Sequence, residues 1–264
     1  MTGLAWAPEL YQRHADARLR PALELLARVP LEEATHVVDL GCGAGALLPF
    51  LRRRFPGARL TGVDLSPSML AQAAAVDPEA TLLHADASTW RPEAPVDLII
   101  ANAVLHWLDD HPRLIHDLLA RCRVLAVQVP DNFTAPAYLA IRALMAEPPW
   151  AERLAGVRMG DNVLSPEAYC AILRGAGRAA DVWQTTYQQQ MAGPDAVLDW
   201  LRATTLLPVQ AALGGADAAP NAAFEATLGE RLRAAYPADP TGGVRFAFRR
   251  LFFVASEGQS TSSG

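Results

Sequence analysis

A glycine-rich turn between a buried strand and a helix constrains this chain more than any other feature. The run Val-Val-Asp-Leu-Gly-Cys-Gly-Ala-Gly occupies residues 37–45, after a predicted strand at His36–Leu40 and before a predicted helix at 46–55. Glycine lets the backbone turn tightly and approach a ligand where a Cβ would collide. The helix that follows starts with unpaired N–H groups, which bind anions. The turn therefore predicts a binding site for a ligand with a polar or anionic part.

Strands and helices alternate through the first half of the chain. Further strands are expected at 58–63, 81–84, 96–101 and 124–129, and further helices at 66–76 and 112–120. Ser66-Pro67 is a strong helix start, because a hydroxyl cap precedes a proline at the first helical position. Such alternation predicts an α/β fold with a mostly parallel sheet and helices on both faces.

The second half of the chain is organised differently. We expect a helix at 166–176, a strand at 181–187, two or three helices within 194–236, and a last strand at 244–255. The predicted domains are a cap helix at 1–30, a core at 31–188 and 244–256, a helical insertion at 189–243, and a disordered tail at 257–264. Open α/β sheets bind ligands at the carboxyl ends of their strands, so the insertion is expected to lie over the substrate site.

Composition narrows the class of protein. The chain has 264 residues, of which 51% are hydrophobic, and a net charge of −5. That hydrophobic content excludes a disordered chain, and the net negative charge argues against a nucleic-acid partner. Its longest apolar stretches fall short of the ~20 residues that a membrane span needs. Every basic residue is arginine, which excludes Schiff-base chemistry and a Walker-type phosphate loop, since both need lysine.

Location and assembly are predicted less directly. The three cysteines fit no metal cluster, and the sequence starts without a basic region followed by an apolar core. We therefore expect a cytoplasmic protein without a metal, as a monomer or a small homo-oligomer.

Polar side chains stand where four successive predicted strands end. They are Asp39, Asp64, Asp86 and Asn102. Together they form an arc able to hold a long ligand that joins a nucleoside to an amino acid. The loop alone does not decide the ligand, because Gly41-x-Gly43-x-x-Ala46 followed by Asp64 also satisfies the loose dinucleotide fingerprint. A nicotinamide-dependent oxidoreductase is therefore one alternative, and a non-catalytic binding module is another.

The loop and the arc together resemble the class I S-adenosylmethionine-dependent methyltransferases. The resemblance implies a Rossmann-like sheet whose last strand is antiparallel, S-adenosyl-L-methionine as cofactor and S-adenosyl-L-homocysteine as product. It implies that Asp39 and Gly41 meet the methionine part, that Asp64 accepts from both ribose hydroxyls, and that Asp86 and the Ala87 backbone read the adenine. The full implied cofactor set is Tyr11, Arg18, Asp39, Gly41, Cys42, Gly43, Gly45, Asp64, Leu65, Met69, Asp86, Ala87, Asn102 and Ala103.

A closer resemblance covers residues 6–255. Segments such as Arg20-Pro21-Ala22, Pro130-Asp131-Asn132, Ala235-Tyr236-Pro237 and Arg250-Leu251-Phe252 are similar to the trans-aconitate 2-methyltransferases. That family implies esterification of one carboxylate of a small organic acid. The chain departs from the pattern at Leu207, where an arginine is expected, and at Gln189, where a histidine is expected, so a related acid is an alternative to trans-aconitate.

Five residues are candidates for orienting the acceptor. They are His14, His106, Trp107, Asn132 and Arg250. A carboxylate acceptor is ionised at neutral pH and needs no general base. A hydroxyl acceptor would need one, and His106 is then the candidate. The plain alternative for each candidate is a structural role in packing or in a turn.

Overall fold

The computed structural model describes residues 15–257, with side chains from residue 19 onward. Tyr11, His14 and the predicted tail lie outside the described residues, as does the Arg18 side chain. The chain divides into two compact units. Of the described residues, a sheet unit holds Asp16–Pro130, Asn162–Gln184 and 250–257, and a helical unit holds Asp131–Asp161 and Thr185–Arg249.

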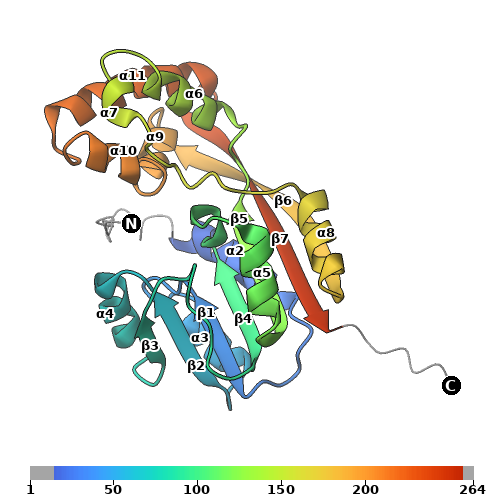
Figure 1. The fold of residues 1–264 in the computed structure, drawn as a ribbon. Coiled ribbons are helices and arrows are strands. Elements are labelled where there is room, and N and C mark those ends of the chain that lie inside the picture. The colour runs from blue at the N-terminus through green and yellow to red at the C-terminus, as the bar shows by residue number, and fades with distance from the viewer. Residues whose placement is uncertain (1–14, 258–264) are drawn as a thin grey trace. The chain divides into compact units, whose positions relative to one another are not determined.

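One seven-stranded sheet runs in the order β3-β2-β1-β4-β5-β7-β6 (Figure 1). Its strands are β1 (His36–Leu40), β2 (Arg59–Asp64), β3 (Thr81–His84), β4 (Val96–Asn102), β5 (Cys122–Pro130), β6 (Arg178–Ala192) and β7 (Gly243–Glu257). Strands β1 to β5 pair in parallel, whereas β7 pairs antiparallel to β5. The predicted class, mostly parallel with an antiparallel last strand, is confirmed.

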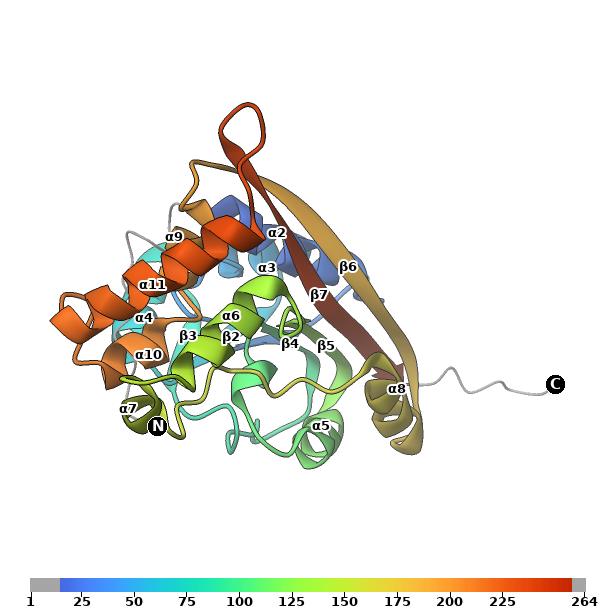
Figure 2. The same ribbon diagram turned by 90° about the horizontal axis from the view of Figure 1, so that it is seen from above.

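Helices cover both faces of the sheet (Figure 2). Those of the sheet unit are α2 (Ala15–Ala27), α3 (Leu48–Arg54), α4 (Pro67–Val76), the 3₁₀ turn η1 (Leu105–Trp107), α5 (His111–Leu119) and α8 (Pro166–Gly175). Helix α4 begins as predicted, because the Ser66 hydroxyl accepts from the Met69 N–H. None of the helices among the described residues is long and apolar enough to cross a membrane.

The two faces of the sheet carry different kinds of side chain. Alternate residues of the central strands, such as Val38, Ala101 and Val127, join α5 and α8 in one buried apolar core. Because successive side chains of a strand point to opposite faces, Asp39, Asn102 and Gln128 belong to the other face. All three stand at or near the carboxyl ends of their strands. The core thus fixes the strands, and polar groups are left on the opposite face at that edge.

The helical unit holds more helices than the sequence indicated. They are α6 (Pro136–Met145), α7 (Ala151–Leu154), α9 (Ala196–Arg202), α10 (Leu207–Ala212) and α11 (Ala219–Ala235). A polar network ties three of them together, since Glu225 accepts from Arg202 Nε at 2.6 Å, Gln210 Nε2 at 3.0 Å and Asn221 Nδ2 at 2.9 Å.

Three sequence-based expectations differ from this structure. Helices α6 and α7 were not predicted, since Ala135 and Trp150 precede them without a side-chain cap. Residues 131–161 were assigned to the core, yet they cluster with residues 185–249 because α6 packs on α11. Strand β6 is also longer than predicted, running from Arg178 to Ala192 instead of 181–187.

Candidate active site

The glycine turn connects β1 to α3, and its backbone takes conformations that favour glycine. Gly41 adopts φ +75°, a conformation that favours glycine, and its N–H donates to the Val63 carbonyl at 2.7 Å. A Cβ at Gly41 would overlap a methyl group of the Val104 side chain. The turn after β1 therefore packs directly against the turn after β4, and only glycine fits at this position.

The open side of the turn lies at Gly43. Its N–H donates to Asp64 Oδ2 at 2.9 Å, and the Ser66 N–H donates to Asp64 Oδ1 at 2.8 Å. These two bonds hold the carboxylate in place after β2 and leave its further lone pairs available. A Cβ built at Gly43 would meet no heavy atom within 4 Å, so a ligand can approach this backbone closely.

Asp39 is a buried carboxyl group whose pKa is strongly raised. It is 3% exposed, and burial, followed by the negative charge of Asp64, raises its pKa to about 7. Its Oδ2 has no hydrogen-bond partner within the described part of the chain. A buried carboxylate lacking a partner fits a cationic group such as the ammonium of an amino acid. This observation agrees with the predicted methionine-binding role of Asp39.

The predicted nucleoside end lies along β2 and β3. Leu65 is 40% exposed directly after β2, and Asp86 follows β3 with its Oδ1 accepting from the Ser88 N–H at 2.8 Å. Met69 is buried in α4 and Ala87 is half-buried. Cys42 is buried beside Gly62, and burial raises the pKa of its thiol far above the usual range. A thiol that stays protonated in this way is a poor nucleophile.

The turn after β4 is strained. Ala103 adopts φ +58°, which costs a residue with a Cβ about 1–2 kcal/mol. The Ala103 N–H donates to the Gln128 carbonyl at 2.8 Å, so the β5 backbone holds the strained residue in place. Asn102 lies just before it, and its Oδ1 has no partner among the described residues. Strain of this kind is retained where the surrounding structure fixes it, often at binding sites.

The 3₁₀ turn η1 places His106 and Trp107 beyond the end of β4. His111 Nε2 contacts the Leu105 carbonyl at 2.8 Å, and its Nδ1 contacts the Tyr169 hydroxyl at 2.7 Å. The Asn162 N–H donates to the His106 carbonyl at 3.2 Å. These contacts fix η1 from α5 and from the residues before α8. His111 therefore positions the turn that carries His106.

His106 is a neutral imidazole. It is 7% exposed, and burial, then the positive charges of Arg250 and His111, lower its pKa to about 3. Its Nδ1 has no partner within residues 15–257. The ring stands 5.1 Å from that of Trp107. A group that binds a proton so weakly is a poor general base near neutral pH, because efficient bases have pKa values near the working pH.

Arg250 and Gln128 complete the polar edge of the sheet unit. Arg250 is 6% exposed on β7 and lies close enough to His106 to lower its pKa. Gln128 is 1% exposed on β5, and sequence analysis did not single it out. Asn132 belongs to the helical unit, where its Oδ1 accepts from the Arg249 N–H at 2.6 Å. The structure thus joins His106, Trp107 and Arg250 in one unit, whereas Asn132 anchors a turn in the other.

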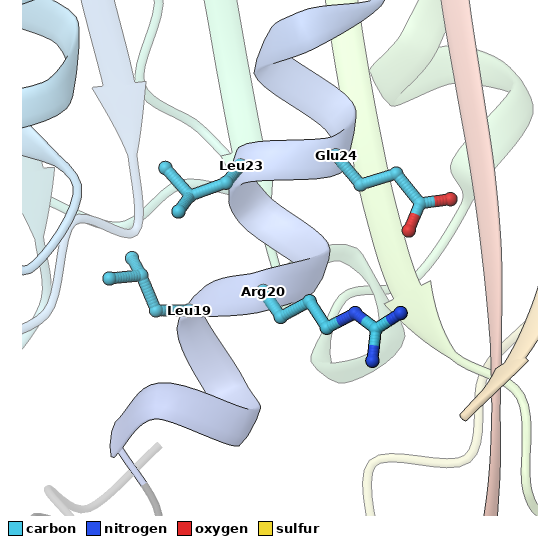
Figure 3. A pocket seen from close by; sticks show the side chains of 4 residues that line it. All are labelled: Leu19, Arg20, Leu23 and Glu24. Carbon is cyan, nitrogen blue, oxygen red and sulfur yellow. The ribbon is translucent and has the colours of Figure 1, made fainter. Parts of the chain in front are cut away.

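An open hollow of about 510 Å³ lies along α2 within the sheet unit. It is lined by Leu19 and Leu23, which extend to one side of the helix, and by Arg20 and Glu24, which extend to the other (Figure 3). Helix α2 therefore carries a cation and a carboxylate one helical turn apart along this hollow. No group of histidine, cysteine and acidic residues suited to a metal occurs among residues 15–257.

Comparison with known proteins identifies the family. Residues 11–179 match the family model described as "Methyltransferase domain". The trans-aconitate 2-methyltransferase of Streptomyces avermitilis is 46% identical over 263 residues, which cover 95% of this chain and 96% of that protein. The chain belongs to the trans-aconitate 2-methyltransferase family. The enzyme of that name from Escherichia coli O157:H7 is 41% identical over 253 residues, or 95% of this chain and 97% of that protein.

Solved structures show that the family fold is shared more widely. The YcgJ protein of Bacillus subtilis superposes with a TM-score of 0.57 at 13% identity, over 90% of this chain and 98% of that one. Such a likeness speaks to the fold alone. Membership of a methyltransferase family confirms the predicted enzyme class, S-adenosylmethionine-dependent methyl transfer, and decides against the nicotinamide alternative. The predicted roles of single residues stay predictions.

Proposed function

We propose that this methyltransferase esterifies one carboxylate of trans-aconitate, or of a closely related small polycarboxylic acid. The observation that carries the proposal is the pair of buried groups His106 and Arg250 at the carboxyl edge of the sheet. A buried guanidinium is the side chain best suited to a carboxylate partner, and a neutral histidine beside it supplies a further hydrogen bond. The names of relatives 41–46% identical to this chain support the same acid.

The residues of the cofactor region fit S-adenosylmethionine. Asp39 offers a buried carboxylate for the ammonium, Gly43 offers open backbone, and Asp64 and Asp86 stand at consecutive strand ends. When bound, this cofactor supplies a methyl group on a positively charged sulfur. The protein's task is then to hold the acceptor oxygen in line with that methyl group and to exclude water.

The acceptor chemistry follows from the charges. A carboxylate oxygen attacks the methyl carbon and an ester forms, while the bond from carbon to sulfur breaks with its electrons left on sulfur. No proton is transferred, so no general base is needed. The low pKa of His106 favours this reaction over methylation of a hydroxyl group, which would need a base at that position.

The test uses purified protein in two steps. Calorimetric titration with S-adenosylhomocysteine should show binding, and incubation with S-adenosylmethionine and trans-aconitate should yield a monomethyl ester by mass spectrometry. Citrate and succinate serve as comparison acids, because Leu207 stands where an arginine is expected. A methyl ester of another acid only would assign a different substrate, and no ester of any acid would refute the proposal. Location in the cytoplasm and the oligomeric state stay predictions.

A further inference from the structure

Several buried polar atoms of the sheet unit have no hydrogen-bond partner among the residues that the structure describes. They include Asp39 Oδ2, Asn102 Oδ1, His106 Nδ1, and both Gln128 Nε2 and Gln128 Oε1. Native proteins satisfy nearly all buried polar groups, so such atoms call for an explanation. The complete amide of Gln128 is the most unusual of them, because its donor and its acceptor both lack a partner.

The sheet register explains why neighbouring residues leave this amide unsatisfied. Gln128 pairs with Asn102 on β4 and with Phe252 on β7, and both partners therefore stand beside it on the same face. Phe252 stacks on Trp183 with ring centroids 4.9 Å apart and offers no hydrogen bond to an amide. Along β5 itself, the next residues on this face are Ala126 and Pro130, whose side chains are apolar. Of these four neighbours, Asn102 alone is polar, and its Oδ1 also lacks a partner among the described residues.

The groups around Gln128 indicate which ligand would satisfy it. Arg250 stands on β7 opposite Pro130 and supplies a positive charge, while His106 is neutral and can supply one N–H donor. The Gln128 amide adds two further N–H donors. A set of neutral donors beside one buried cation is complementary to a carboxylate, which accepts several hydrogen bonds and carries one negative charge.

Position along the sheet separates this site from that of the cofactor. Asp39 stands on β1, and the predicted nucleoside contacts continue through β2 to β3. Gln128 lies two strands away in the other direction and two residues further along the strands, roughly 12 Å from Asp39, because neighbouring strands are ~4.8 Å apart and each residue rises ~3.3 Å. Asn102, on the strand between them, separates the two ends. The β4, β5 and β7 side of the edge is therefore available to the methyl acceptor.

We propose that Gln128 binds a carboxylate of the methyl acceptor through its side-chain N–H groups, beside His106 and Arg250. This inference rests on the proposed function and adds a specificity-determining residue to it. The buried amide is retained because the substrate carboxylate, and not the protein, accepts hydrogen bonds from its N–H groups.

Two substitutions at Gln128 test the proposal. Gln128→Leu removes the donors at similar volume, and Gln128→Glu replaces the N–H groups with a negative charge. With S-adenosylhomocysteine present, the affinity for trans-aconitate, citrate or succinate should fall about 10- to 100-fold in Gln128→Leu and further in Gln128→Glu. Affinity for S-adenosylhomocysteine itself should change less than about twofold, since Asp39 and the glycine turn are intact.

Stability of the ligand-free protein separates substrate binding from a structural role. Gln128→Leu should leave the melting temperature unchanged or raise it, because an apolar group replaces an amide that has no partner. Gln210→Leu is the matched control: Gln210 is also buried, but its Nε2 donates to Glu225 Oε1 at 3.0 Å, so its loss should lower the melting temperature.

Each possible result either supports or contradicts the proposed role of Gln128. Loss of acid affinity in Gln128→Leu with stability kept supports the proposal. Unchanged acid affinity, a fall in melting temperature equal to that of Gln210→Leu, or a wild-type protein that binds none of the three acids would overturn it. If the wild type binds an acid that it does not methylate, the proposed function fails while the binding role of Gln128 stands.

Discussion

The pH dependence of cofactor binding is the sharpest consequence of the buried Asp39. Its pKa of about 7 means that much of the protein carries a neutral carboxyl group there at pH 7 and below. An ammonium group binds well only to the ionised form. Binding of S-adenosylhomocysteine should therefore weaken as the pH falls through 7, although the ligand keeps its own positive charge over that range.

The size of the effect follows from the pKa. With a pKa of about 7, roughly three quarters of the Asp39 carboxyl groups are ionised at pH 7.5 and about 3% at pH 5.5. The dissociation constant should accordingly rise about 25-fold between these pH values, which corresponds to ~1.9 kcal/mol. At pH 6.5 each binding event should release about 0.8 protons, because bound Asp39 is ionised.

Isothermal titration calorimetry measures both quantities. Dissociation constants are recorded from pH 5.5 to 7.5, and the released protons are counted from the heats in two buffers that differ in ionisation enthalpy. Asp39→Asn is the control, because its amide does not titrate in this range. Asp64→Asn removes the second cause of the raised pKa, so the whole profile should move to lower pH.

Two results would refute this reasoning. A wild-type dissociation constant that is constant from pH 5.5 to 7.5 would mean that Asp39 is already ionised without ligand. If the dissociation constant of Asp39→Asn depends on pH as that of the wild type does, the group that titrates is not Asp39. Weak and pH-independent binding by Asp39→Asn, together with the expected wild-type slope, would place the ammonium at Asp39.

Three further predictions concern stability. The folded pKa of Asp39 lies above the unfolded value, so the stability it contributes is present at low pH and is lost as the pH rises through about 7. Asp39→Asn should then stabilise the ligand-free protein by a few kcal/mol at pH 8 and much less at pH 4, as urea denaturation would measure. Gly41→Ala should destabilise the protein by about 2 kcal/mol or more, because the new Cβ would collide with Val104 and the residue has a positive φ. Adding Val104→Ala to the same chain should recover part of that stability, as thermal melts would show. Ala103→Gly should raise the free energy of unfolding by about 0.5–1 kcal/mol, since glycine removes the strain at φ +58° but adds entropy to the unfolded chain; an unchanged denaturation midpoint would mean that the turn stores no strain.

Much of the sheet could be predicted from the sequence because its signals are local. Apolar runs mark the five parallel strands, and Ser66-Pro67 marks the start of α4, so these bounds agree with the structure to within one or two residues. Helix α6 escaped notice because Ala135 precedes it without a capping side chain. The division into two units depends on packing between α6 and α11, which lie far apart in the chain, and no local pattern encodes that contact.

Some residues of the candidate site could be predicted from the sequence and others could not, again because a sequence shows only local patterns. Asp39, Asp64 and Asp86 follow strands that the sequence shows, so their shared edge follows from parallel topology. Gln128 is different, because it lies within an apolar strand and nothing in the sequence around it indicates a function. Its lack of a partner emerges only when the register places Phe252 and Asn102 beside it. That His106 is a poor general base could also not be predicted from the sequence, since its pKa depends on burial and on Arg250.

The charges along the sheet edge suit the chemistry of ester formation. Asp39 on β1 and Arg250 on β7 are both almost fully buried. They stand three strands apart, and the register places Arg250 four residues further along the strands, so they are roughly 20 Å apart and can interact with different ligands. In the proposed reaction the reacting groups are a cationic sulfonium and an anionic carboxylate, and the transfer neutralises both. A site that excludes water strengthens their attraction, since hydration no longer competes with it. Neutral Asn102, His106 and Gln128 between the fixed charges can then orient the acceptor without placing another charge beside the reaction.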